Sequence, residues 1–119
     1  MKFIKSKDVE SYSRKYGRSV KKLLQLKLEQ PVEDLTLYYG ESPQGKLDHH
    51  YHSESTEIIV FPVGGKLTVN SVEYELEAWD LVVLEQGDIH GFQGESGKNT
   101  IHFAIKLPGH NDRVAVEEN

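Results

Sequence analysis

The 119-residue chain contains no cysteine, which excludes thiolate metal sites and leaves its redox compartment undetermined. No apolar run approaches the roughly 18 residues that a membrane-spanning helix requires. The first residues, MKFIKSKDVE, lack the apolar stretch of a signal peptide, so we expect a cytoplasmic protein. Glycine-rich nucleotide loops and Ser/His/Asp or Cys/His nucleophile sets are also missing. The net charge of −5 argues against nucleic acid or an anionic membrane as a partner.

The chain does contain a series of short strand patterns separated by turn signals. Apolar residues alternate with polar ones, or β-branched residues cluster, in segments 21–29, 34–40, 56–65, 66–77, 80–88 and 100–109. Within 66–77, an Asn70-Ser71 turn between two alternating runs predicts a hairpin. Strands punctuated by turns about every eight to twelve residues predict an all-β sandwich or barrel.

A short helix is predicted near the N-terminus. Asp8 is a suitable N-cap, Val9, Tyr12 and Tyr16 fall on one helical face, and Gly17 is a suitable end. We therefore expect one domain over 1–119, with a strand and helix in 1–20 and a barrel over about 21–108.

The segment HHYHSESTE, residues 49–57, concentrates metal-binding side chains. Successive side chains of a strand point to opposite faces, so His50 and His52 share one face, and His49 and Tyr51 share the other. A short hairpin would return Glu57 beside the two histidines. An isolated His-x-His is more often a polar surface strand than a ligand pair, so the spacing of the remaining ligands decides between these readings.

A third histidine, His90, follows a Gly-Asp turn at the start of another predicted strand. Three imidazoles and the Glu57 carboxylate suit a divalent Fe, Mn, Ni, Cu, Co or Zn ion, but not Ca. They would leave one or two coordination positions open, which is typical of a catalytic rather than a structural site.

The spacing of these residues resembles the two sequence motifs of the cupin family. The first motif is matched by Gly45, His50, His52, Glu57 and Gly64, with the interval from Gly45 to His50 one residue short. The second is matched by Asp80, Gly87 and His90, and departs from the pattern at Trp79, Glu85 and Gly94, where glycine, proline and asparagine are usual. The chain is thus similar to small single-domain cupins over roughly residues 35–107.

This resemblance implies a double-stranded β-helix, or jelly roll, with a metal ion bound by His50, His52, Glu57 and His90 in its open mouth. Strand alternation predicts that the pocket around the ion is lined by inward side chains, namely Leu24, Leu26, Leu37, Tyr39, Ile59, Phe61 and Phe92. By the same alternation, we expect His49 and His102 to lie away from the ion. Glu54 should also lie away from it because it falls in the turn, and His110 because it falls in a surface loop after the last strand.

Two functions fit such a site. The first is a metal-dependent oxygenase, isomerase or lyase acting on a small oxygen-bearing substrate, with Tyr39 or Tyr51 as candidates for the acid or base. The second is a binding or sensing module that grips a small molecule through the metal without turnover, because fold alone does not determine function. The resemblance also implies a homodimer, in which the N-terminal MKFIKS could add a strand to the partner's sheet.

Overall fold

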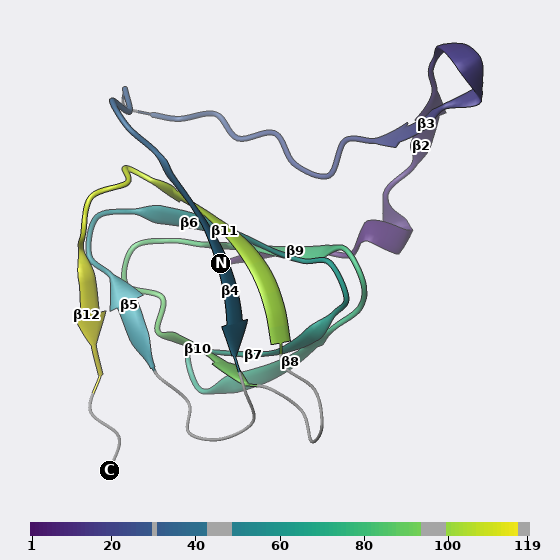
Figure 1. The fold of residues 1–119 in the computed structure, drawn as a ribbon. Helices are drawn as coiled ribbons and strands as arrows, with labels where there is room; N and C mark the ends of the chain where they lie inside the picture. The colour runs from purple at the N-terminus through teal and green to yellow at the C-terminus, as the bar shows by residue number, and fades with distance from the viewer. Residues whose placement is uncertain (30, 43–48, 94–99, 117–119) are drawn as a thin grey trace.

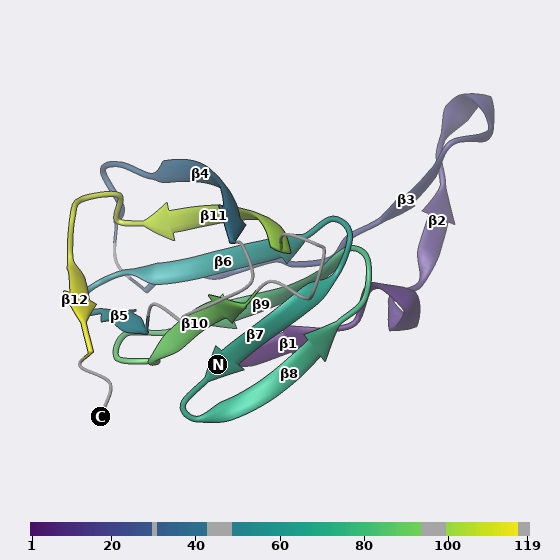
Figure 2. The same cartoon turned by 60° about the horizontal axis from the view of Figure 1, so that its bottom comes forward.

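The structure, a computed structural model, describes residues 1–29, 31–42, 49–93 and 100–116. Two antiparallel five-stranded sheets face each other (Figures 1 and 2). The first sheet has the order β1-β9-β6-β11-β4, formed by Lys2–Ile4, Asp80–Leu84, Thr56–Phe61, Thr100–Leu107 and Thr36–Ser42. The second has the order β12-β5-β10-β7-β8, formed by Arg113–Ala115, His50–His52, His90–Gln93, Gly65–Val69 and Val72–Leu76.

The core lies between the two sheets and is built by strand alternation. In β6 every second residue is buried, so that Glu57, Ile59 and Phe61 face inward. All five residues of β9 are buried, because both faces of this strand are covered. The buried apolar cluster consists of Ile59, Phe61, Leu67, Val69, Leu76, Val82, Leu84 and Ala104. The all-β prediction is therefore confirmed, and Asn70 and Ser71 form the predicted hairpin turn with left-handed φ angles of 49° and 71°.

The predicted N-terminal helix is wrong. Residues Ser6–Asp8 and Lys15–Gly17 form single 3-10 turns, and the chain between and after them forms the hairpin of β2, Ser11–Ser13, and β3, Ser19–Lys21. Tyr16 and Gly17 have consecutive left-handed φ angles of 65° and 71°, which reverse the chain and are incompatible with a helix. The spacing of Tyr12 and Tyr16 fits either structure, so it did not discriminate between them. None of the helices in the described ranges is long and apolar enough to cross a membrane.

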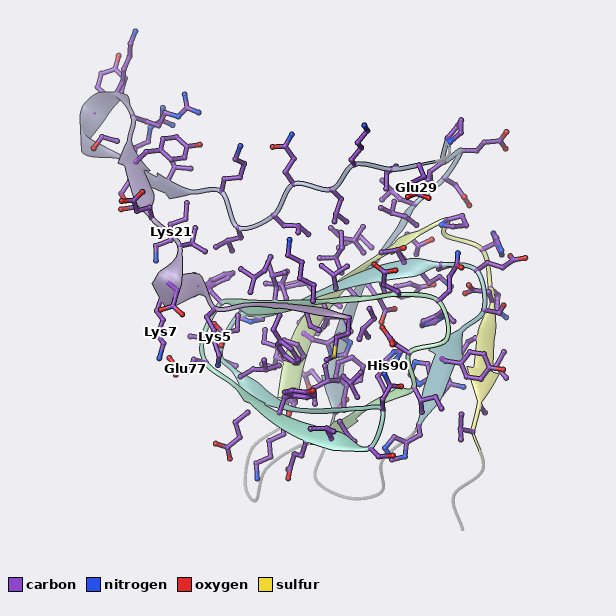
Figure 3. All side chains as sticks on the ribbon, turned by 180° about the vertical axis from the view of Figure 1, so that it is seen from behind. Lys5, Lys7, Lys21, Glu29, Glu77 and His90 are labelled. Carbon is purple, nitrogen blue, oxygen red and sulfur yellow. The ribbon has the colours of Figure 1, made fainter. Side chains whose placement is uncertain are left out.

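The N-terminal strand also differs from the expectation that it would serve a partner subunit. Its residues Lys2–Ile4 pair with Val83–Leu81 of β9 within the same chain. The hairpin that follows projects away from the barrel (Figure 2). Its base is held by the buried Asp80 carboxylate, which accepts hydrogen bonds from the Ser6 N–H at 3.0 Å and the Lys5 ammonium at 3.1 Å. Lys7 and Glu77 pair beside this anchor at 3.1 Å (Figure 3).

The strand predicted over 21–29 ends at Lys21, and residues 22–29 and 31–35, which precede β4, lie outside the barrel (Figure 1). Leu24 and Leu26 are half-buried in this connecting segment, so they do not belong to a barrel strand. Leu26 instead contributes, with Val83 and Leu107 of the barrel, to a cleft of about 850 Å³. The alternation of Leu24 and Leu26 requires only that one side of the segment be packed. A segment that lies against the outside of a barrel meets this requirement without pairing as a strand, so the alternation did not establish a strand here.

Left-handed backbone at three motif positions shows what glycine does in these motifs. Trp79, which stands where the cupin pattern has glycine, has φ 69°, so the turn before β9 keeps the glycine-like conformation without glycine. Gly64 has φ 78°, and a Cβ there would lie 2.5 Å from the Leu76 carbonyl oxygen. Gly87 has φ 84° but open space around it. Gly45 and Gly94 lie outside the described residues.

This difference predicts unequal effects of two alanine substitutions. Gly64→Ala should be more destabilising than Gly87→Ala by at least about 1 kcal/mol, because both incur left-handed strain of about 1–2 kcal/mol but only the first also meets backbone atoms. Chemical denaturation of the two variants and the wild type measures this. Equal losses of stability in the two variants would contradict it.

Candidate metal centre

Three histidines from two neighbouring strands lie together on the inner face of the second sheet. His50 and His52 alternate on β5, and His90 begins β10 directly opposite His50 in the antiparallel register. One ring nitrogen of each histidine lies within 4.8 Å of one ring nitrogen of the other two. His90 is fully buried inside the barrel (Figure 3). These three side chains form a cluster that could hold a metal ion.

Glu57 reaches this cluster from the opposite sheet. It is the first inward residue of β6 and only 6% exposed. Its Oε2 atom lies 3.3 Å from His52 Nε2, and its Oε1 atom lies 3.3 Å from His90 Nε2. The four side chains that the sequence nominated as ligands are thus brought together by two sheets.

Hydrogen bonds on the far side of two imidazoles orient them toward Glu57. His90 Nδ1 lies 3.0 Å from the Asp88 carbonyl oxygen, and His52 Nδ1 lies 3.1 Å from Asp112 Oδ1. Carbonyl and carboxylate oxygens only accept, so Nδ1 is the protonated nitrogen when either ring carries a single proton, and Nε2 then presents its lone pair to the cluster. Both Nε2 atoms are buried and have no hydrogen-bond partner.

The distances from Glu57 to two of the histidines fit a shared first-row divalent ion. Two ligands that each lie about 2.1 Å from one ion are separated by about 3.0–3.4 Å, depending on the coordination angle. The observed 3.3 Å between Glu57 and each of the His52 and His90 nitrogens falls in this range. Buried lone pairs without partners are uncommon in folded proteins, and a shared cation would satisfy both at once.

The electrostatics of the cluster keep a negative charge on Glu57. Burial by itself raises the pKa of this carboxyl, but His52 and His90 outweigh burial and lower the pKa to about 2 when a proton lies on the nitrogens that face Glu57. Glu57 in turn raises the pKa of the His52 imidazole above its usual value, with a further contribution from Asp112. A cation bound at this cluster would therefore compete with a proton for His52 Nε2.

His102 faces the interior, whereas strand alternation predicted that it would lie away from the ion. Its ring stacks on Phe92, with centroids 3.9 Å apart and an interplanar angle of 8°. Its Nδ1 atom is buried without a hydrogen-bond partner. Desolvation lowers the pKa of His102, so the ring is neutral at neutral pH. Gly40 is the sequence feature that could have indicated the inward position of His102. It pairs with His102 in the β4–β11 register, and a Cβ at Gly40 would lie 2.3 Å from the His102 ring.

The predicted facing of β11 and β4 was therefore wrong. In β11 the buried side chains are Thr100, Ala104 and Lys106, whereas Phe103 is 39% exposed. Leu37 and Tyr39, the cross-strand partners of Ile105 and Phe103, are 64% and 58% exposed. These aromatic and aliphatic residues cover the outer face of the sheet, so apolar character did not identify the inner face.

Of the predicted pocket residues, Ile59, Phe61 and Phe92 face the interior. Ile59 and Phe61 are fully buried in the core, and Phe92 packs against that core with its ring 6.2 Å from Phe61. The other four lie outside the barrel. Leu24 and Leu26 belong to the segment that precedes β4, and Leu37 and Tyr39 lie on the outer face of β4.

The two tyrosines proposed as acid or base do not reach the cluster. The Tyr39 hydroxyl donates to Glu41 at 2.5 Å on the outer surface. Tyr51 alternates with His50 and His52 and so points to the opposite face of β5. His49 lies against Gly91, also on that outer face, as alternation predicted. Glu54 is exposed in the β5–β6 turn and pairs with exposed His110.

Comparisons with known proteins find similarity at the level of structure. No protein-family model matches the chain, and no curated protein matches it in sequence. An uncharacterised Klebsiella pneumoniae protein with a double-stranded β-helix domain is 16% identical, covering 76% of this chain and 81% of its own, with a TM-score of 0.63. Streptomyces Pac13 is a nucleoside dehydratase. The structure of one of its variants with uridine is 18% identical to this chain, covering 96% of this chain and 88% of its own, with a TM-score of 0.59.

An enzyme with different chemistry shares the same architecture. Salicylate 1,2-dioxygenase from Pseudoaminobacter salicylatoxidans, with gentisate, is 20% identical over 61% of this chain and 20% of its own, with a TM-score of 0.52. The predicted architecture is confirmed by these similarities: the chain has the double-stranded β-helix fold.

Proposed function

We propose that this protein is a metal-dependent enzyme of the cupin type that acts on a small oxygen-bearing molecule. The observation that carries the proposal is the convergence of His50, His52, His90 and Glu57 with two buried, unpartnered Nε2 atoms. Three nitrogens and one carboxylate suit Fe, Mn, Ni, Cu, Co or Zn and leave coordination positions for a substrate. A small molecule, rather than nucleic acid or a membrane, is the partner that suits a buried site in a chain of net charge −5.

The reaction class that fits best is that of an oxygenase or a related isomerase or lyase. When bound, the ion would supply Lewis acidity toward substrate oxygens. Phe61 and Phe92 provide an apolar wall that excludes water and strengthens charge interactions. The neutral His102 is placed to accept a proton at Nδ1. Two proteins of the same fold, one a nucleoside dehydratase with uridine and one a dioxygenase with gentisate, support a small oxygen-bearing ligand.

Metal content tests the ligand assignment. Protein purified without chelator should contain about one divalent ion per chain, and His52→Ala and Glu57→Gln should lose it, because each removes a ligand. His49→Ala is the matched control and should retain the ion, since His49 lies on the outer face of β5. Elemental analysis of the four proteins decides this. Equal metal content in all of them would exclude the assignment.

Turnover separates an enzyme from the alternative of a non-catalytic binding or sensing protein. Fe-, Mn-, Ni- and Zn-loaded protein should convert at least one of a set of small diketones, phenols, hydroxy acids and nucleosides. His102→Phe retains an aromatic ring against Phe92 and should keep metal and ligand binding but lose turnover by about 100-fold or more. Tyr39→Phe, on the outer surface, should leave the rate unchanged. Tight ligand binding without turnover in every metal form would favour the binding protein.

We also propose a homodimer that buries the outer face of β4 and β11. Leu37, Tyr39 and Phe103 expose apolar surface there, and β4 is the edge strand of its sheet. Exposed apolar patches and uncovered sheet edges commonly mark association surfaces.

Light scattering should therefore give a mass of about twice 13.6 kDa. Leu37→Glu should shift the protein toward the monomer, because it places a charge in the buried interface. Val63→Glu is the control, since Val63 is similarly exposed at 66% but lies in the β6–β7 turn, outside β4 and β11. A wild-type mass of one chain at micromolar concentration would rule out the dimer.

A further inference from the structure

A buried ion pair lies directly behind the histidine cluster. Asp112 is 8% exposed, and Lys106 is 3% exposed. The Lys106 ammonium donates to Asp112 Oδ1 at 3.1 Å and to the His110 carbonyl oxygen at 2.6 Å. Lys106 is the cross-strand neighbour of Glu57 on the inner face of the first sheet. A buried lysine is costly unless it is paired, so this arrangement indicates a specific task for Asp112.

The Asp112 carboxylate is held from three directions. Its Oδ2 atom accepts hydrogen bonds from the backbone N–H groups of Ser55 at 2.8 Å and Glu54 at 2.9 Å, both in the β5–β6 turn. Its Oδ1 atom faces the Lys106 ammonium and His52 Nδ1, each at 3.1 Å. These four contacts use the acceptor capacity of a carboxylate in full, so its orientation toward His52 is fixed.

This contact determines which nitrogen of His52 faces the cluster as a lone pair. His52 lies between two carboxylates, with Nδ1 3.1 Å from Asp112 Oδ1 and Nε2 3.3 Å from Glu57 Oε2. When the ring carries a single proton, the shorter contact with the fixed Asp112 carboxylate places that proton on Nδ1 and leaves Nε2 bare. The bare Nε2 is the buried, unpartnered atom 3.3 Å from Glu57. The tautomer of His90 is fixed in the same way by the backbone carbonyl of Asp88, two residues earlier in the chain. The tautomer of His52 depends instead on the Asp112 side chain, 60 residues later in the chain.

We propose that Asp112, held by Lys106 and the β5–β6 turn, is a positioning residue that fixes the tautomer and orientation of His52 for ion binding. This inference rests on the proposed metal site. Metal-bound histidines generally donate their second ring N–H to such a partner, and loss of that partner typically lowers metal affinity about 10- to 100-fold.

The chain contains a matched control in Asp80. This carboxylate is also buried, and it also accepts from one lysine, Lys5, and two backbone N–H groups, those of Ser6 and Glu77. It anchors the N-terminal hairpin instead of a histidine. Asp80→Asn therefore reproduces the loss of a buried, lysine-paired carboxylate without touching the cluster.

The first measurement uses metal-free protein. Long-range proton–nitrogen NMR at a pH where the imidazoles are neutral should show His52 protonated on Nδ1 in the wild type and in Asp80→Asn. The Asp112→Asn/Lys106→Met variant, which removes both charges and so leaves neither buried alone, should lose this preference. Retention of the Nδ1–H tautomer in that variant would overturn the proposal.

The second measurement is Co²⁺ affinity by competition with a chelating indicator. The Asp112→Asn/Lys106→Met variant should bind Co²⁺ about 10- to 100-fold more weakly than the wild type. Asp80→Asn should match the wild type in affinity even if it unfolds more easily. Equal affinity in all three proteins would overturn the positioning role. If the wild type binds no Co²⁺, the proposed function fails, and the tautomer in the metal-free protein still decides whether Asp112 orients His52.

Discussion

A charged side chain buried in this barrel must have a partner, and that constraint organises the interior. Glu57 lies between apolar sheets, where an isolated carboxylate would be strongly disfavoured. Two imidazoles from the facing sheet lower its pKa to about 2 when a proton lies on the nitrogens that face it, and a bound cation would take the place of that proton. Each imidazole then needs an acceptor behind it, which Asp88 and Asp112 supply. Asp112 in turn is paired with Lys106, so one buried carboxylate leads to a chain of dependent contacts.

The sheet architecture makes this chain of contacts possible because it brings together strands that are distant in sequence. β5 lies between β10 and β12, so His50 and His52 lie beside His90 on one side and close to Asp112 on the other. The first sheet delivers Glu57 and Lys106 from the paired strands β6 and β11. Short strands in rigid ladders are well suited to holding such side chains, because neighbouring positions are fixed by register.

The fold by itself does not specify the chemistry. Proteins of this architecture include a nucleoside dehydratase and a dioxygenase, each less than 25% identical to this chain. The features that distinguish this chain are therefore local. They are the two unpartnered Nε2 atoms, the stacked His102 and the buried Asp112–Lys106 pair, and the proposals made above depend on these contacts.

Local patterns determined the elements of this protein whose partners are close in sequence. The alternation of His50 with His52, the Asn70-Ser71 turn and the glycine-like turns around β6 and β9 follow from backbone geometry within a few residues. The predicted helix failed for the same local reason, since the spacing of Tyr12 and Tyr16 fits a helix and a hairpin equally well. Which face of a strand is inside was decided only by the tertiary structure. Both faces of β4 and β11 carry apolar residues, so Tyr39 and Leu37 were assigned inward and His102 outward, the reverse of their positions. The role of Asp112 also required the fold, because its hydrogen bond to His52 joins residues 60 apart, and no periodicity in a sequence encodes a contact at that distance.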